Sequence, residues 1–164
     1  MSRSELEREL RTHHDAAYGW ALSCCRFDSE RAKDVLQETY LRVLDGRARY
    51  GGASAFRTWL FGVVRNVARA LHRRAALHAL LTLRFAEAPA EIAAGDPGDD
   101  RALRAALLTI STRQREVLML VFYNGLSIQE AAQALNISLG SARQHYERGK
   151  AALRRRLEDA GVAP

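Results

Sequence analysis

Apolar residues recur every three or four positions along most of the chain, which is the spacing of α-helices that bury one face. In the N-terminal half this pattern predicts three helices. The first spans residues 4–26. The second is capped by Asp28 or Ser29 and ends near Leu44, and the third is capped by Ser54 and ends near Arg74. The third helix has the clearest apolar stripe, formed by Phe56, Trp59, Leu60, Val63, Val64, Val67 and Leu71.

Shorter helices are predicted in the C-terminal half. The first spans about Asp100–Thr109, and the next opens at Ser111, which has Gln114 three residues later as in a capping box. The dipeptide Asn124-Gly125 is a typical C-terminal stop signal for that helix. The C-terminal half therefore begins with two helices before any motif that suggests a function.

The strongest motif is a pair of helices joined by a short turn. Ser127 and Glu130 form a capping box that opens a helix through Leu135, the turn is residues 136–138, and Ser138 caps a longer helix to about Leu157. This order predicts a helix-turn-helix. Its shared core is expected to consist of Ile128, Ala131, Ala132, Leu135, Ile137, Ala142, Tyr146 and Leu153.

The helical pattern weakens between the two halves. An alanine-rich stretch from about Ala75 leads into residues 87–100, which combine proline, glycine and acidic residues, as flexible linkers do. We therefore expect an all-α fold with two small helical domains, residues 1–76 and 101–164, joined by a flexible linker over residues 77–100.

Composition and charge agree with a folded DNA-binding protein. The 164 residues are 48% hydrophobic and 27% charged, and the formal net charge is +6. The charge is +5 over residues 1–80, −3 over residues 81–102 and +4 over residues 103–164. Apart from Lys33 and Lys150, every basic residue is an arginine, which suits contacts to phosphates and base edges.

The second helix of the helix-turn-helix presents polar side chains near its start, where a recognition helix meets base edges. Arg143 suits guanine, Gln144 adenine and Glu147 a cytosine amino group, while Ser141 and Arg148 suit phosphates. A bare helix face at Gly140 would let the backbone approach the DNA. The alternative is an ordinary solvated helix face.

Other classes of function find little support in the sequence. No apolar run approaches the roughly 20 residues of a membrane span, and the N-terminus lacks a signal-peptide core, so we expect no membrane insertion and a cytoplasmic location. We expect no enzymatic activity, no catalytic residues, no metal and no cofactor. The five histidines show no metal-ligand pattern: His13, His14, His72, His78 and His145.

Two cysteines are adjacent, so on a helix they point in different directions and make a poor disulfide or chelating pair. Cys24 and Cys25 are therefore expected to pack inside the fold, with redox sensing as the alternative.

Several segments together resemble known bacterial families. Residues 110–118, 125–132 and 140–145 resemble both the −35-reading domain of sigma factors and the effector domain of response regulators. Residues 34–43, 56–68 and 73–74 resemble region 2 of extracytoplasmic-function sigma factors of the sigma-70 family. The resemblance covers nearly the whole chain, and the βα alternation of a receiver domain is absent.

The resemblance implies a role in transcription initiation. A sigma factor binds core RNA polymerase, through the β′ clamp helices and the β flap, and recognises the −10 and −35 elements of promoter DNA. An anti-sigma factor is a further partner that the flexible linker would accommodate. The competing hypothesis is a stand-alone helix-turn-helix regulator of the response-regulator effector type, which never meets polymerase.

An acidic stripe on the second helix fits the polymerase-binding role. Asp34, Glu38, Leu41 and Asp45 are spaced by four, three and four residues, so they share one face. Such a face suits a basic partner helix with an apolar centre. Gln37 and Arg42 lie beside the stripe and complete the predicted surface, and an ordinary solvated face is the alternative.

For the −10 element, the resemblance points to the glycine-rich loop and to the polar side of the third helix. Tyr50 would stack an unpaired base and Asn66 would hydrogen-bond one, while Arg49, Arg65 and Arg69 would hold phosphates. Trp59 is a candidate wedge between bases, but its place on the apolar stripe favours a core role.

Overall fold

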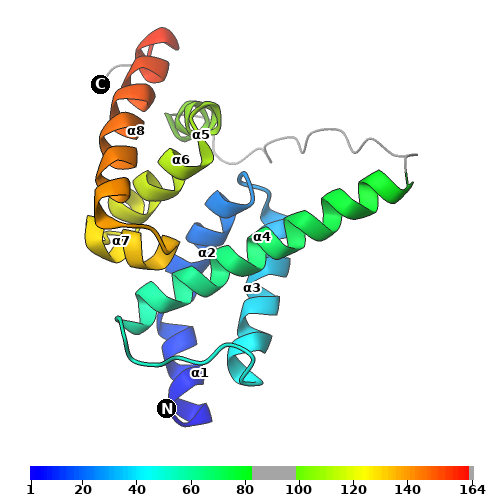
Figure 1. Cartoon of the computed structure of the whole chain (residues 1–164). Helices are drawn as coiled ribbons and strands as arrows, with labels where there is room; N and C mark the ends of the chain where they lie inside the picture. The colour runs from blue at the N-terminus through cyan, green and yellow to red at the C-terminus, as the bar shows by residue number, and fades with distance from the viewer. Residues whose placement is uncertain (83–98, 163–164) are drawn as a thin grey trace. The chain divides into compact units, whose positions relative to one another are not determined.

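The computed structural model describes residues 1–82 and 99–162, which belong to two compact units. All regular secondary structure in these residues is helical (Figure 1). The predicted all-α architecture with two helical domains is therefore confirmed. Each unit is described separately below.

The N-terminal unit is built from four helices, three of which surround its core. They are α1 (Arg3–Thr12), α2 (His14–Cys24), α3 (Ser29–Leu44) and α4 (Phe56–Thr82). The single helix expected over residues 4–26 is in fact α1 and α2, separated at His13, whose φ of −102° and ψ of 10° end the first helix. Because of this break, α1 packs on α3 while α2 packs on both α3 and α4.

The core of this unit is centred on Trp20 of α2. Trp20 is fully buried, its ring lies 6.2 Å from that of Phe61, and its Nε1 donates a hydrogen bond of 2.9 Å to the Phe61 carbonyl oxygen in α4. Buried side chains from α2, α3 and α4 surround it. They include Ala17, Ala21, Val35, Leu36, Val43, Leu60, Val64 and Val67.

The start of α3 follows the local sequence, but the end of α4 does not. Asp28 caps α3 by accepting a hydrogen bond from the Arg31 amide at 3.1 Å, as predicted. In contrast, α4 continues to Thr82 and does not end near Arg74. The extension has no glycine or proline and is rich in alanine and leucine, so helix propensity sustains it although residues 73–82 are exposed. The remainder of the predicted linker, residues 83–98, lies outside the described residues.

The C-terminal unit contains α5 (Asp99–Thr109), α6 (Thr112–Leu118), a π-helix η1 (Met119–Tyr123), α7 (Ile128–Leu135) and α8 (Leu139–Asp159). As predicted, the Ser111 side chain caps α6 by accepting from the Gln114 amide at 3.2 Å. The helix that follows Ser111 ends at Asn124, but its last turn is the π-helix η1. Asn124 holds this turn, because its side-chain and backbone N–H groups both donate to the Met119 carbonyl at 3.0 Å.

The helix-turn-helix has the predicted caps. Ser127 and Glu130 exchange hydrogen bonds of 3.1 and 2.8 Å, and Ser138 accepts from the Ser141 amide at 3.1 Å. Asn136 makes the turn in the left-handed region, with φ of 53°. Of the predicted core, Ala131, Ala132, Leu135 and Ala142 are buried. Ile128, Ile137, Tyr146 and Leu153 are only half-buried.

The approach of α8 to α6 depends on Gly149, which sequence analysis did not single out. A Cβ at this position would lie 3.1 Å from Leu118 Cδ1 and 3.2 Å from Gln114 Cβ. We therefore expect Gly149→Val to crowd this contact and to destabilise the C-terminal unit by about 1–3 kcal/mol. Gly140→Val is the matched control, because a Cβ at Gly140 has no neighbour within 4 Å.

Urea unfolding of the full chain measures this effect. Far-UV circular dichroism follows both units, while tryptophan fluorescence follows the N-terminal unit alone, because both tryptophans, Trp20 and Trp59, belong to it. Gly149→Val is expected to lower the dichroism midpoint and to leave the fluorescence midpoint in place. Equal midpoints for the two valine variants would contradict the packing argument.

The two cysteines lie at the end of α2. Cys25 is 2% exposed, and burial raises the pKa of its thiol to about 12, whereas Cys24 is half-buried. Because the thiolate is the reactive form, Cys25 is chemically inert at neutral pH. Its burial supports a packing role.

Alkylation with iodoacetamide at pH 8 tests this assignment. In a Cys24→Ser variant, Cys25 is expected to react at least about a hundredfold more slowly in the folded chain than in urea, because little thiolate forms below the raised pKa. A Cys25→Ser variant, which retains Cys24, is the control for reagent access to this end of α2. Fast labelling of folded Cys25 would show that its thiol is accessible and ionised.

Candidate nucleic-acid interface

The first candidate surface is the N-terminal part of α8. Its first turn is held by the Ser138 cap, whose acceptor oxygen binds the Ser141 amide, and the Ala142 methyl group is fully buried beneath it. Ser141 is half-buried, and the other four predicted residues are exposed: Arg143, Gln144, Glu147 and Arg148. One helix therefore presents hydrogen-bond donors and acceptors of the kinds that read the edges of DNA bases, and the core of the unit fixes the position of this helix.

The second candidate surface is the polar side of α4. Asn66 and Arg69 are exposed there, and Arg73 follows one turn later. Arg65, however, is only 5% exposed, so the prediction that it lies on the exposed polar side of this helix is wrong. The reason is helical geometry, because Arg65 shares a face with Phe61 and Ala68, which are both buried.

The loop before α4 brings Tyr50 into contact with aromatic residues of that helix. The Tyr50 ring lies 5.3 Å from both Phe56 and Trp59, and its hydroxyl donates to the Ser54 carbonyl. Trp59 is half-buried in this cluster at the edge of the unit, which is neither the deep core position favoured by the stripe nor a free wedge. Arg49 is exposed, and its Nε donates to the Gly46 carbonyl at 3.2 Å.

His13 joins the same cluster and was missed by sequence analysis. Its ring stacks on Phe56 with centroids 6.1 Å apart. The contact joins the break between α1 and α2 to the first turn of α4, more than 40 residues away. No local spacing in the sequence signals such a contact, whereas Tyr50 could be found because the loop precedes the helix directly.

The third surface is the acidic stripe on α3, and its charge is partly compensated. Glu38 pairs with Arg42 at 2.6 Å and with Arg47 at 3.4 Å, while Arg47 also pairs with Asp45 at 2.7 Å. The hydrogen bond from Arg42 lowers the pKa of Glu38, and the Arg47 backbone and side chain lower the pKa of Asp45. Both carboxylates are therefore charged at neutral pH.

The remaining residues of this surface are open to solvent. Asp34 and Gln37 are exposed, and Leu41 is 50% exposed although it is a large apolar residue. The predicted combination of acidic groups around an apolar centre is present on α3. Arg47, which pairs with both Glu38 and Asp45, lies beyond the helix and was not predicted as part of the stripe.

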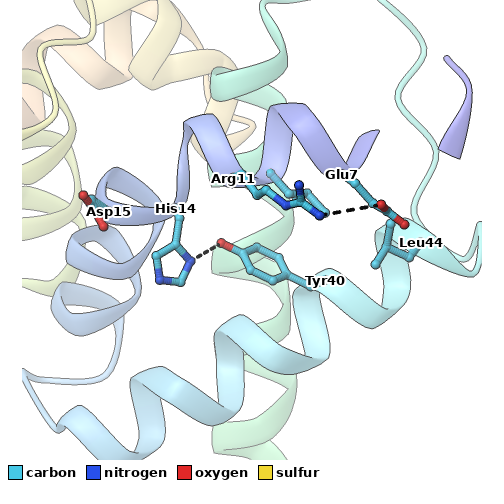
Figure 2. Close-up of a pocket in the computed structure, with 7 residues that line it drawn as sticks. Glu7, Arg11, His14, Asp15, Tyr40 and Leu44 are labelled. Atoms are coloured by element: carbon cyan, nitrogen blue, oxygen red, sulfur yellow. Dashed lines mark hydrogen bonds and ion pairs between the residues drawn. The ribbon is translucent and has the colours of Figure 1, made fainter. Parts of the chain in front are cut away.

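Two open hollows adjoin this stripe between α3 and the first two helices. One, of about 590 Å³, is lined by residues that include Glu7, Arg11, Asp15 and Leu44 (Figure 2). The other, of about 540 Å³, is mostly apolar, and Gln37 and Leu41 lie on it.

His14 and Tyr40 line both hollows. Figure 2 shows their side chains pointing toward each other, with His14 Nδ1 2.9 Å from the Tyr40 hydroxyl. Burial raises the pKa of Tyr40 to about 12, so this hydroxyl stays protonated at neutral pH. The hollow of about 540 Å³ extends the apolar part of the α3 surface beyond Leu41.

Within residues 1–82 and 99–162, no group of three histidine, cysteine or acidic side chains is arranged to hold a metal ion. In the same ranges, no helix is long and apolar enough to cross a membrane.

Family models match both units. The model described as Sigma-70 region 2 matches residues 10–77, and the model described as Sigma-70, region 4 matches residues 100–153. The first match covers α2, α3 and most of α4, and the second covers the helix-turn-helix.

Curated relatives match over most of the chain. The chain is 30% identical over 158 residues to the ECF RNA polymerase sigma factor SigX of Bacillus subtilis (strain 168), covering 90% of this chain and 80% of SigX. It is 34% identical over 129 residues to the RNA polymerase sigma factor CarQ of Myxococcus xanthus, covering 77% of this chain and 74% of CarQ.

A solved structure shares the fold. It is the sigma factor RpoE of Bartonella quintana in complex with the anti-sigma factor NepR, with a TM-score of 0.81 and 22% identity over 94% of this chain and 97% of RpoE. The chain is also similar to CnrH, solved in complex with the cytosolic domain of CnrY, with a TM-score of 0.68 and 23% identity over 96% of this chain and 90% of CnrH.

Proposed function

The chain belongs to the extracytoplasmic-function sigma factors of the sigma-70 family and directs promoter-specific transcription initiation, and we propose that its three exposed surfaces divide this work. The observation that carries the proposal is the presence, in one chain, of a region 2 unit and a region 4 unit with exposed polar faces. A stand-alone helix-turn-helix regulator is not favoured, because it would not account for the region 2 unit.

The α8 surface is proposed to read the −35 element. A recognition helix contacts bases with the residues near its N-terminus, where Arg143 and Gln144 are exposed. Arg143 suits guanine through two hydrogen bonds, Gln144 suits adenine, and the Glu147 carboxylate suits the cytosine amino group. Ser141 and Arg148 are proposed to bind phosphates.

The α4 surface and the loop before it are proposed to engage the −10 element. Asn66 is exposed and suited to hydrogen-bond an unpaired base, while Arg69 and Arg49 neutralise the backbone of the separated strand. Tyr50 has its hydroxyl occupied by Ser54 and its ring against Trp59, so a captured base would meet the edge of this aromatic cluster. Buried Arg65 is not part of this surface.

The α3 surface is proposed to bind the β′ clamp helices of core polymerase. Half-exposed Leu41 supplies the apolar centre, and exposed Asp34 and Gln37 flank it. Glu38, Arg42 and Asp45 complete the surface. Their ion pairs with each other and with Arg47 hold the charged groups in fixed positions around Leu41.

Further contacts are proposed for the whole chain. The region 4 unit is proposed to contact the β flap. Domain bounds of 1–76 and 101–164 are also proposed, with α4 continuing into the connecting segment.

RpoE of B. quintana was solved with an anti-sigma factor, and this supports a comparable anti-sigma factor for this chain. Because its partners are polymerase and promoter DNA, we place its activity in the cytoplasm.

Leu41→Arg tests the polymerase-binding surface. The substitution puts a charge at the apolar centre, and we expect the affinity for core RNA polymerase to fall about tenfold or more. Leu77→Arg is the matched control, because Leu77 is also an exposed leucine of the N-terminal unit, at 58%, but lies on α4. Fluorescence titration of labelled full-length chain with core polymerase gives both affinities. Equal affinities for the two variants would remove Leu41 from this role.

Arg143→Ala tests the −35 surface. Loss of a bidentate contact to guanine is expected to cost about 1–3 kcal/mol of discrimination at one base pair of the −35 element. The affinity for core polymerase should stay unchanged. Arg101→Ala, which removes an exposed arginine of α5, is the control for general loss of positive charge. Reconstituted transcription from a set of single-base −35 variants measures the preference, and parallel loss of polymerase binding would contradict the assignment.

A further inference from the structure

A chain of four contacting side chains links η1 to the exposed face of α8. It begins with Phe122, which is 66% exposed yet stacks on Tyr146 with ring centroids 5.7 Å apart and an interplanar angle of 19°. The π-turn that places Phe122 is held by the double hydrogen bond from Asn124. Tyr146 was expected in the shared core, but it lies half-buried at the edge of it.

Lys150 continues this chain. Its Nζ lies 4.4 Å from the centre of the Tyr146 ring and 3.3 Å from Glu147 Oε1. An ammonium group is attracted by the face of an aromatic ring and by a carboxylate, so both contacts act on the same cation. The Lys150 side chain is 33% exposed, much less than that of Glu147 at 68%. The Lys150 side chain is therefore held in place, and it attracts the more exposed Glu147 carboxylate.

The position of Glu147 matters because Arg143 lies one helical turn before it. Residues three or four apart on a helix are neighbours, so the Glu147 carboxylate can pair with either of two cations, Arg143 or Lys150. Among the described residues, its ion pair is with Lys150. An Arg143 guanidinium that is not shared with a carboxylate keeps its paired N–H donors available for the two acceptors of guanine.

We propose that Lys150 and Tyr146 are positioning residues that determine −35 specificity: Tyr146 holds Lys150, and Lys150 draws the Glu147 carboxylate away from Arg143. This inference rests on the proposed −35 role of α8. Neither positioning residue needs to touch a base. When Lys150 loses its charge, Glu147 pairs with Arg143, and the arginine then reads guanine less well.

The test is a double-mutant cycle in the full chain, with core RNA polymerase and two promoters that differ at one −35 base pair. This base pair is the one whose preference disappears in Arg143→Ala. Lys150→Met keeps the length of the side chain and removes its charge. We expect the ratio of the two transcripts to fall about two- to fivefold, which corresponds to a surface ion pair. In a Glu147→Ala background the same substitution should leave the ratio unchanged.

Two conservative variants separate positioning from simple packing. Lys150→Arg keeps the cation and Tyr146→Phe keeps the ring, so both should retain the transcript ratio. Tyr146→Val removes the ring and should lower the ratio in the same direction as Lys150→Met. Far-UV circular dichroism should be the same for all variants, which unfolding of the C-terminal unit would not allow.

The remaining outcomes distinguish a failure of the inference about Lys150 from a failure of the proposed −35 role of α8. An unchanged ratio in Lys150→Met would overturn the inference, as would an equal fall in the presence and absence of Glu147, because Lys150 would then contact DNA itself. If Arg143→Ala alters no −35 preference, the proposed reading role of α8 fails instead, and the cycle has no base pair to report on. The failure of the inference and that of the proposed function are therefore distinguishable.

Discussion

The N-terminal unit depends on the contact between Trp20 and α4. Its indole N–H donates to the Phe61 carbonyl inside a fully buried site, so the largest core side chain also fixes the angle at which α2 meets α4. An N–H group buried there without an acceptor would carry a desolvation cost of about 1–3 kcal/mol. Because α3 packs on the same two helices, the surface on α3 proposed to bind polymerase and the surface on α4 proposed to engage the −10 element are both positioned by this one core.

In the C-terminal unit, small residues rather than one large side chain determine how the helices pack. Ala131 and Ala142 are fully buried where α7 and α8 cross, and Gly149 lets α8 approach Leu118 of α6. Such a contact leaves little room for adjustment, since native interiors are close-packed. The orientation of α8 is therefore determined by the packing of the whole unit, and substitutions of its exposed residues are expected to leave that orientation unchanged.

Local signals in the sequence predicted local structure well. The caps at Asp28, Ser111, Ser127 and Ser138 each need only a side chain and an amide three residues away, and all four are present. The features that sequence analysis missed depend on distant or tertiary partners. Arg65 was expected on the polar side of its helix, but the helical register puts it between the buried residues Phe61 and Ala68. The stacking of His13 on Phe56 and the ion pairs of Arg47 likewise require the folded chain.

In the proposed division of work among the three surfaces, single side chains are sufficient to read promoter bases. Each DNA-facing surface carries only a few cations, and the sequence-independent part of DNA affinity grows with the number of phosphates neutralised. Neither unit alone is therefore expected to bind DNA tightly. If the α3 surface attaches the chain to polymerase as proposed, contact with the second promoter element becomes intramolecular, and the effective concentration depends on the segment that joins the two units. Under these conditions we expect a change of about 1 kcal/mol at Arg143 to alter which promoter is used and to leave assembly with polymerase intact.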